Sequence, residues 1–305
     1  MPENDSITWT LDGHDLELNH PGRILWPADG ITREDLVAYY RDIAPVMLPH
    51  LADRPVTLRT YPEGVDGPAF YQRDLPEHAP AWLRTVDYTG KSTTRTIQVP
   101  LVDTAAGLVW LANTGAIEFH GWSARAPLLD QPDQAIFDLD PGEAAPFADV
   151  LQAALLVREA LHQDGLQGYP KTSGRHGLHV HVPLAPGASY AEVRSWVKHV
   201  AERLEANHAG LVAVARGATH RGEDVTIDYA QNSIARNTAA PYTVRAAPGA
   251  TVAAPLSWQE VEDGAVRPGD FTLRTMRERV AAHGDLLARV LQGDQHLPTP
   301  EHDQE

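Results

Sequence analysis

The chain contains no cysteine and very few lysines, and both absences limit what it can be. Without cysteine there is no disulfide, no thiolate nucleophile and no cysteine-ligated zinc. This composition is typical of a reducing cytoplasm, where we expect the protein. Only three of the 25 basic residues are lysines, and the rest are arginines. The planar guanidinium suits two-pronged phosphate contacts, although a GC-rich genome produces the same bias.

Long apolar runs are also missing. No segment approaches the roughly 20 apolar residues of a membrane-spanning helix, and residues 1–5 lack the basic and apolar regions of a signal peptide. The 305 residues are 43% hydrophobic and 22% charged, as in an ordinary globular protein. The net charge of −16 argues against a nucleic-acid partner unless basic residues gather locally.

Apolar periodicity predicts helices that alternate with strands. Helices are expected at 32–47, at 147–164 and from Ser189 onward, the first and third with capping boxes. The expected strands are 54–60, 94–99, 135–140, 178–184, 225–229 and 241–245. This order predicts an α/β or α+β protein with mixed sheets. We expect one domain over 1–292, with a soft internal division near 125–134, and a flexible acidic tail over 293–305.

Two carboxylates end the expected strand 135–140. Asp138 and Asp140 project from one face, because side chains alternate along a strand. Two negatively charged side chains on neighbouring positions of one strand face repel each other unless a cation lies between them. Mg²⁺ is such a cation, because it prefers carboxylate oxygens together with substrate phosphates. The pair therefore favours a phosphoryl-transfer site, although most Asp-x-Asp sequences are solvated turns.

A glycine-containing turn precedes the expected strand 178–184. Its backbone N–H groups, with Ser173 and Arg175, are suited to bind a triphosphate. Asp228 ends the strand 225–229 and can supply the third carboxylate of a two-metal site. The turn and the three carboxylates together predict transfer from a nucleotide.

A zinc site is the alternative for the same region. His179 and His181 are two residues apart and so share one face of a strand. This is ligand spacing, and Asp138, Asp140 or His120 could complete a zinc centre. The zinc interpretation leaves the glycine-containing turn unexplained.

Several ordered motifs carry a family resemblance. The main ones are Phe-Asp-Leu-Asp-Pro-Gly at 137–142, Lys-Thr-Ser-Gly through His179 at 171–179, Ile-Asp-Tyr-x-Gln-Asn at 227–232 and Pro-Tyr-Thr-Val-Arg at 241–245, with shorter ones at 24–27, 39–40, 48–50, 54–55, 118–122 and 255–261. In this order they resemble the polymerase domain of bacterial ligase D, of the archaeo-eukaryotic primase superfamily. The resemblance implies an α+β primase-like core, with mixed sheets flanked by helices. It also implies template-directed, ribonucleotide-preferring addition of nucleotides at broken DNA ends in non-homologous end joining.

The resemblance also assigns roles to individual residues. Two Mg²⁺ or Mn²⁺ ions would be held by Asp138, Asp140 and Asp228. The nucleotide would be bound by His120, Ser173, Gly174, Arg175, His176, His179, Gln231 and Arg245. DNA would be bound by Arg23, Arg33, Arg54, Phe70, Tyr71, Arg73 and Arg221. Within that set, Arg23 and Arg33 correspond to lysines that bind a 5′ phosphate, and the aromatic residues stack on the template.

The expected partners follow from the same resemblance. The chain ends without room for a ligase or nuclease, so we expect a stand-alone primase-polymerase at the nucleoid that acts with Ku and a separate DNA ligase. A non-catalytic module that bridges DNA ends is a second hypothesis, which the intact carboxylate triad disfavours. A zinc-dependent hydrolase is the third.

Overall fold

The computed structural model describes residues 6–90, 93–215 and 222–298. Most strands belong to two sheets. One has five strands in the order β11 (Tyr169–Thr172), β12 (Leu178–Pro183), β10 (Gln134–Pro141), β14 (Val225–Ile227) and β13 (Val212–Val214). The other has four, β15 (Asn237–Ala239), β9 (Ala116–Trp122), β5 (Val56–Thr60) and β6 (Phe70–Gln72). In the five-stranded sheet β13 and β14 are parallel and the other neighbours antiparallel, so the predicted mixed sheet is confirmed.

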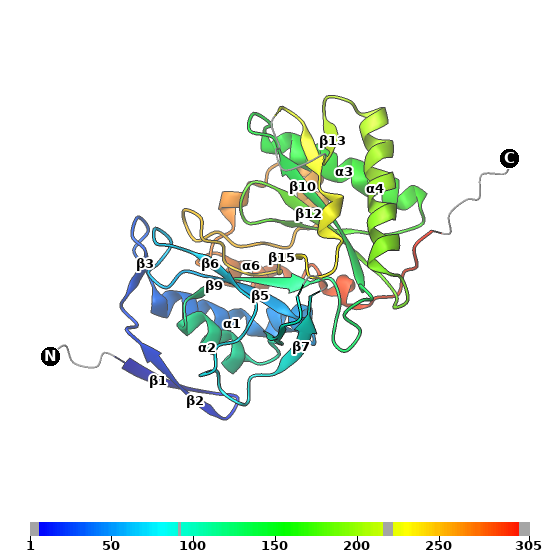
Figure 1. Ribbon diagram of the computed structural model, residues 1–305. Coiled ribbons are helices and arrows are strands. Elements are labelled where there is room, and N and C mark those ends of the chain that lie inside the picture. The colour runs from blue at the N-terminus through cyan, green and yellow to red at the C-terminus, as the bar shows by residue number, and fades with distance from the viewer. Residues whose placement is uncertain (1–5, 91–92, 216–221, 299–305) are drawn as a thin grey trace.

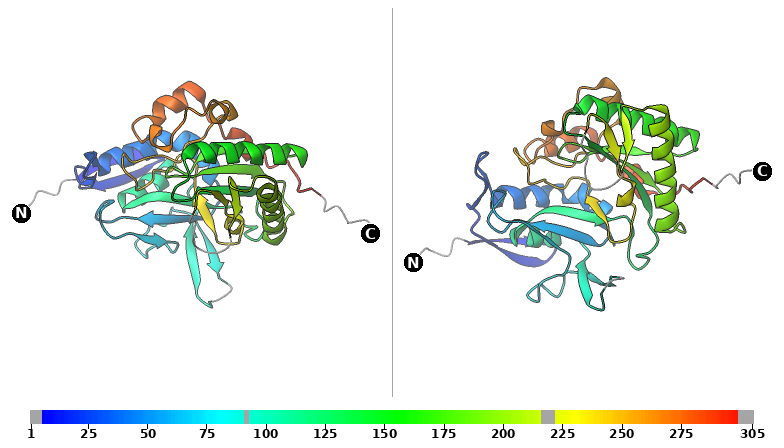
Figure 2. Two further views of the ribbon diagram at one scale, coloured as in Figure 1. Left: turned by 90° about the horizontal axis from the view of Figure 1, so that it is seen from above. Right: turned by 45° about the horizontal axis from the view of Figure 1, so that its top comes forward.

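The remaining described strands form three two-stranded antiparallel ribbons. They are β1 (Ser6–Leu11) with β2 (His14–Asn19), β3 (Ile24–Trp26) with β4 (Ile31–Thr32), and β7 (Thr85–Thr89) with β8 (Thr96–Pro100). The β7–β8 ribbon stands away from the body of the molecule (Figure 2).

Helices cover one face of each sheet. They are α1 (Arg33–Leu51), α2 (Ala105–Asn113), α3 (Phe147–Gln163), α4 (Tyr190–Asn207), α5 (Trp258–Asp263) and α6 (Met276–His283), with short 3₁₀ helices at η1 (Tyr229–Gln231), η2 (Pro268–Asp270) and η3 (Ala288–Leu291). Both α3 and α4 pack on β10, whereas α1 and α2 pack together beneath β5 and β9 (Figure 1). None of the described helices has the length and apolarity needed to cross a membrane.

Local sequence explains where these helices begin. Thr32 and Ser189 each cap their helix through the predicted capping box, with the third residue's carboxylate bonded back to the cap. Gly165, in the left-handed conformation, follows α3 as expected. The apolar residues of the two sheets and of the helices that cover them form one continuous core.

The segment 240–256 lies between the two sheets and bonds to both (Figure 1). The N–H of Ala240 donates to Phe119 of β9, and the N–H of Thr172 in β11 donates to Ala254. The predicted strand 241–245 is wrong, because Tyr242 adopts a φ of +67°, which a strand does not allow. Of that segment, only Val244 forms an isolated bridge.

Two further boundaries bear on the site. The predicted strand 225–229 ends at Ile227, and Asp228 instead caps the short helix η1 by accepting from the Ala230 N–H at 2.9 Å. Residues 123–133, which span most of the predicted division, connect β9 of one sheet to β10 of the other. Within the expected tail, Gln295 bonds to Gln167 and so ties this part of the chain to the domain.

Candidate active site

Asp138 of β10 and Asp228, which directly follows β14, meet at the middle of the five-stranded sheet. The N–H of Asp228 donates to the carbonyl of Asp138 at 2.9 Å. Asp138 is only 5% exposed, and in the β10–β12 register it lies beside His179, whose Nε2 is 3.1 Å from Oδ1. Asp140 follows on the same face of β10, near Gly177. Adjacent strands thus bring together two of the three predicted carboxylates.

The electrostatics of this pair fit a divalent cation. Burial, and next the negative charge of Asp228, raise the pKa of Asp138 to about 7. A hard ion that prefers carboxylate oxygen would remove this repulsion. Among the described residues, however, no three His, Asp or Glu side chains are grouped closely enough to form a ready metal site. The three-carboxylate site therefore stays a prediction.

The raised pKa of Asp138 has a measurable effect on stability. Its folded-state pKa lies above the ordinary 3.8, so ionisation of Asp138 destabilises the metal-free protein progressively from about pH 4 to pH 7 and fully above that. Asp138→Asn is therefore expected to raise the free energy of unfolding in EDTA by up to about 4 kcal/mol at pH 8 and by less than half of that at pH 5.

Urea unfolding at both pH values measures this difference. Asp133→Asn is the control of opposite sign: although burial acts in the other direction, the charges and hydrogen bonds of Arg54 and Arg125 together hold the pKa of Asp133 below its usual value. That variant should lose stability at pH 8. If Asp138→Asn raised the free energy of unfolding equally at the two pH values, the assigned pKa would be contradicted.

The turn 173–177 is held in one shape by its own hydrogen bonds. The hydroxyl of Ser173 accepts from the N–H groups of Arg175 and Gly177, at 3.3 and 3.1 Å. Gly174 has a φ of +73°, and a Cβ there would approach the backbone N of Ala253 to 2.9 Å. The turn is therefore rigid, and the N–H groups of Arg175 and Gly177 are bonded within it, so its side chains would have to supply the contacts to a phosphate.

A buried carboxylate, Glu118, lies among basic residues of the turn and of neighbouring segments. Its oxygens lie 2.9 Å from His120 Nε2, 3.0 Å from Arg175 Nη2 and 3.1 Å from Arg245 Nε. Arg59 lies farther away, at 3.9 Å. Three arginines surround one carboxylate, so the cluster is locally basic although the chain is acidic.

Two other predicted nucleotide residues contact Asp138, and a third, His176, does not. Gln231 donates a side-chain hydrogen bond to Asp138, and that bond lowers the pKa of Asp138. His179 is buried against the same carboxylate, and burial lowers the pKa of His179 well below its usual value, so the ring is neutral. His176 lies on the exposed side of the turn and borders a groove with Gly142 and Arg175.

Sequence reasoning missed the roles of Glu118 and Lys171. Glu118 and His120 are two apart on β9, and this spacing alone places them on one face. Lys171 is fully buried opposite His179, and its ammonium donates to the carbonyl of Thr172 at 3.3 Å. Within Lys-Thr-Ser-Gly nothing distinguishes a buried lysine from a phosphate-binding one.

The predicted DNA-binding residues divide into two groups. Arg54 is buried, and its guanidinium is taken up by Asp133 and by the carbonyls of His50 and Trp122, so it is not available to DNA. Phe70 and Tyr71 are 50% and 61% exposed on β6. They line a groove with Arg73. Arg221 lies outside the described residues.

Arg23 and Arg33 form a cationic pair. The N–H of Arg33 donates to the carbonyl of Arg23 at 2.8 Å, and burial and the charge of Arg23 lower the pKa of Arg33. Arg33 donates to the carbonyl of Asn19, while its Nε is buried without a partner. Neither arginine is paired with a carboxylate among the described ion pairs, so the two side chains are suited to bind an anion such as a phosphate.

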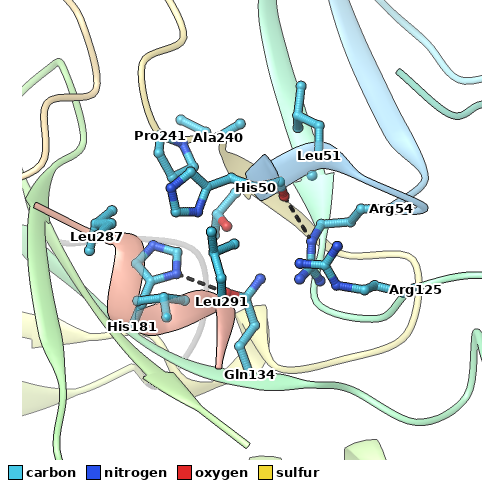
Figure 3. A pocket seen from close by; sticks show the side chains of 14 residues that line it. His50, Leu51, Arg54, Arg125, Gln134, His181, Ala240, Pro241, Leu287 and Leu291 are labelled. Carbon is cyan, nitrogen blue, oxygen red and sulfur yellow. Dashed lines mark hydrogen bonds between the residues drawn. The ribbon is translucent and has the colours of Figure 1, made fainter. Parts of the chain in front are cut away.

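The zinc interpretation fails on the direction of the two histidines. His179 faces Asp138, whereas Nδ1 of His181 donates to Oε1 of Gln134 at 3.0 Å. Figure 3 shows His181 and Gln134 across a pocket from Arg54. The volume of this pocket is about 20 Å³. This pocket, large enough for about one water molecule, is separate from the carboxylates.

Comparison with known proteins gives consistent matches. Residues 32–287 match the model of the family described as LigD, primase-polymerase domain. The multifunctional non-homologous end joining DNA repair protein LigD of Mycobacterium tuberculosis H37Rv is 38% identical over 283 residues, 90% of this chain and 37% of that protein. The bifunctional LigD of Bacillus subtilis is 30% identical over 88% of this chain and 43% of its own length.

The solved structures include a similar fold. The polymerase domain from Mycobacterium tuberculosis Ligase D, in complex with DNA, superposes with a TM-score of 0.85 at 36% identity, covering 90% of this chain and 98% of that one. The chain spans less than half the length of the curated relatives it matches.

Proposed function

Because the chain belongs to the LigD primase-polymerase family, a family of nucleotidyltransferases, we propose that it adds nucleotides, preferably ribonucleotides, to template-paired DNA ends and gaps in bacterial non-homologous end joining. The observation that carries this proposal is the meeting of Asp138 and Asp228 at the core of residues 32–287, the part of the chain that matches the family model. A carboxylate pair near a rigid turn that carries Arg175 could provide what transfer from a triphosphate needs.

The residues of the site would divide the work as follows. Two Mg²⁺ or Mn²⁺ ions held by Asp138, Asp140 and Asp228 would lower the pKa of the primer 3′-hydroxyl and neutralise the triphosphate. Arg175 and Arg245 would orient the phosphates, and the rigid turn would fix their distance from the carboxylates. The protein thus contributes mainly position and charge.

DNA would approach across β6 and the cationic pair Arg23 and Arg33. Exposed Phe70 and Tyr71 offer surfaces on which template bases can stack, each worth about 1–3 kcal/mol. The solved relative is in complex with DNA, which supports this partner. We extend the proposal to Ku and a separate DNA ligase as partners, at the nucleoid in the cytoplasm.

Extension of a gapped duplex tests the function. A labelled primer, a template and a downstream strand with a 5′ phosphate are incubated with each nucleotide type and with Mg²⁺ or Mn²⁺. The proposal expects metal-dependent extension, faster with ribonucleotides. Tight DNA binding without extension would instead identify an end-bridging module, and stoichiometric zinc that survives dialysis would identify a hydrolase.

Replacing Arg23 and Arg33 with alanine is expected to remove the preference for a 5′-phosphorylated gap. The two guanidiniums face no carboxylate among the described ion pairs, so the phosphate is their natural counter-ion, and we expect about 10-fold weaker binding of phosphorylated gaps. Binding of a 5′-hydroxyl gap should change little.

The matched control is Arg41→Ala with Arg277→Ala, two arginines that pair with Asp42. It removes the same charge elsewhere and should keep the preference. If the Arg23 and Arg33 variant lost the same affinity for the 5′-phosphorylated gap and for the 5′-hydroxyl gap, the effect of these arginines would be generally electrostatic.

A further inference from the structure

Glu118 is an unusual residue to find in a site for a polyanion. It is fully buried, and burying a carboxylate is costly unless its oxygens are paired. Here the N–H of Ala246 donates to Oε1 at 3.1 Å, in addition to the contacts with His120, Arg175 and Arg245. Although burial acts in the opposite direction, the hydrogen bond from His120 and the charges of Arg245 and Arg175 hold the pKa of Glu118 below its usual range. It is therefore negatively charged throughout the working pH range.

The partners of Glu118 come from three separate parts of the chain. His120 is on the same strand, β9, Arg175 is in the turn, and Arg245 is in the segment between the sheets. One carboxylate therefore sets the relative positions of the four-stranded sheet, the turn and the intervening segment, all at the site.

Arg245 extends this arrangement into the turn. Its Nε faces Glu118 while its Nη1 donates to the carbonyl of Ser173. Arg175 is bound differently, since its side chain is 35% exposed and only Nη2 is engaged by Glu118. Arg175 is thus oriented with its Nε buried, and only the exposed part of its side chain can meet a ligand.

We propose that Glu118 is the positioning residue of the nucleotide site: it orients His120, Arg175 and Arg245 for the triphosphate without touching the nucleotide itself. This inference rests on the proposed function. The competing role is a simple electrostatic one, in which Glu118 only offsets the charge of the arginines. The two roles predict opposite results, because removing a negative charge from the pocket should strengthen the attraction of a triphosphate.

Two substitutions separate geometry from charge. Glu118→Gln keeps the shape and removes the charge, and Glu118→Asp keeps the charge but withdraws it by one methylene. If Glu118 acts by position, both variants bind nucleotide more weakly, about 10-fold or more for Glu118→Gln and several-fold for Glu118→Asp. If it acts by charge alone, Glu118→Gln binds more tightly and Glu118→Asp is unchanged.

The measurement is calorimetric binding of an α,β-methylene nucleoside triphosphate with Mg²⁺, which needs no turnover. In extension assays the KM for nucleotide should rise much more than kcat falls. Asp133→Asn is the matched control, because Asp133 also pairs with two arginines, Arg54 and Arg125, but at the far end of β10. It should lower the melting temperature and leave nucleotide affinity unchanged.

A double-mutant cycle with Arg175→Gln completes the test. Positioning through Arg175 predicts that Glu118→Gln weakens binding clearly less in the Arg175→Gln background than in the wild type. Unchanged or tighter binding by both Glu118 variants, or additive losses in the cycle, would overturn the inference. If Glu118→Gln does not fold, Glu118→Asp decides alone, since it keeps the buried charge. Absence of nucleotide binding by the wild type would reject the proposed function instead.

Discussion

Replacing Asp138 and Asp140 together with alanine is expected to slow nucleotide addition by about 1000-fold or more. In the proposed mechanism these side chains hold the ions that stabilise charge in the transition state, a contribution of several kcal/mol. Removing them also relieves the repulsion between Asp138 and Asp228, so the fold should not suffer. The loss should therefore appear in the rate of addition and not in stability.

Single-turnover extension of a labelled primer measures this rate, and a gel-shift titration measures DNA affinity on the same substrate. Affinity should stay the same or rise slightly, because two negative charges near the DNA are removed. A matched control removes the same charge from exposed positions on α3 and α4, as Glu159→Ala with Glu202→Ala. Extension that persists in the Asp138 and Asp140 variant would exclude these residues as the metal ligands.

The parts of the site that alternate along a strand could be predicted from the sequence. Period-2 patterning placed Asp138 on a strand face with apolar neighbours on the other side, and the register then put His179 beside it. The capping boxes fixed the starts of α1 and α4 because they depend on residues three apart. The family and the α+β fold, expected from ordered motifs, are confirmed by the comparisons.

What could not be predicted depends on contacts between distant segments. The sequence predicted that Arg54 binds DNA, but its guanidinium donates to both carboxylate oxygens of Asp133, which lies 79 positions along the chain. The segment 241–245 looked like a strand, yet it threads between the sheets with Tyr242 in a left-handed conformation. The burial of Glu118 among arginines is likewise a property of the tertiary fold.

The same distant contacts explain how a chain of net charge −16 can offer a basic site. Two clusters carry arginines in excess of carboxylates: Arg59, Arg175 and Arg245 surround Glu118 alone, and Arg23 and Arg33 stand together with no carboxylate in the described ion pairs. At a Debye length of about 8 Å, such local groupings matter more to a bound phosphate than the overall charge does.

Gly174→Ala is expected to lower kcat/KM for the nucleotide by about 100-fold. The added Cβ would lie 2.6 Å from Cγ of Arg245 and 2.9 Å from the backbone N of Ala253. An arginine side chain can move, but the backbone of the segment between the sheets cannot give way without releasing its bonds to Tyr242 and Thr243. The turn must therefore shift, and the contact of Arg245 with the Ser173 carbonyl is lost with it.

Gly165→Ala separates this steric effect from backbone strain. Gly165 has a φ of +74°, matching the +73° of Gly174, but a Cβ added at Gly165 would meet no atom within 4 Å outside its own chain neighbours. Both variants bear the same cost of about 1–2 kcal/mol for a left-handed alanine, and only Gly174→Ala displaces the turn. Melting temperatures should fall in both variants and further in Gly174→Ala, whereas steady-state extension should be impaired in Gly174→Ala alone. Wild-type kinetics in Gly174→Ala would mean that the turn does not hold the triphosphate.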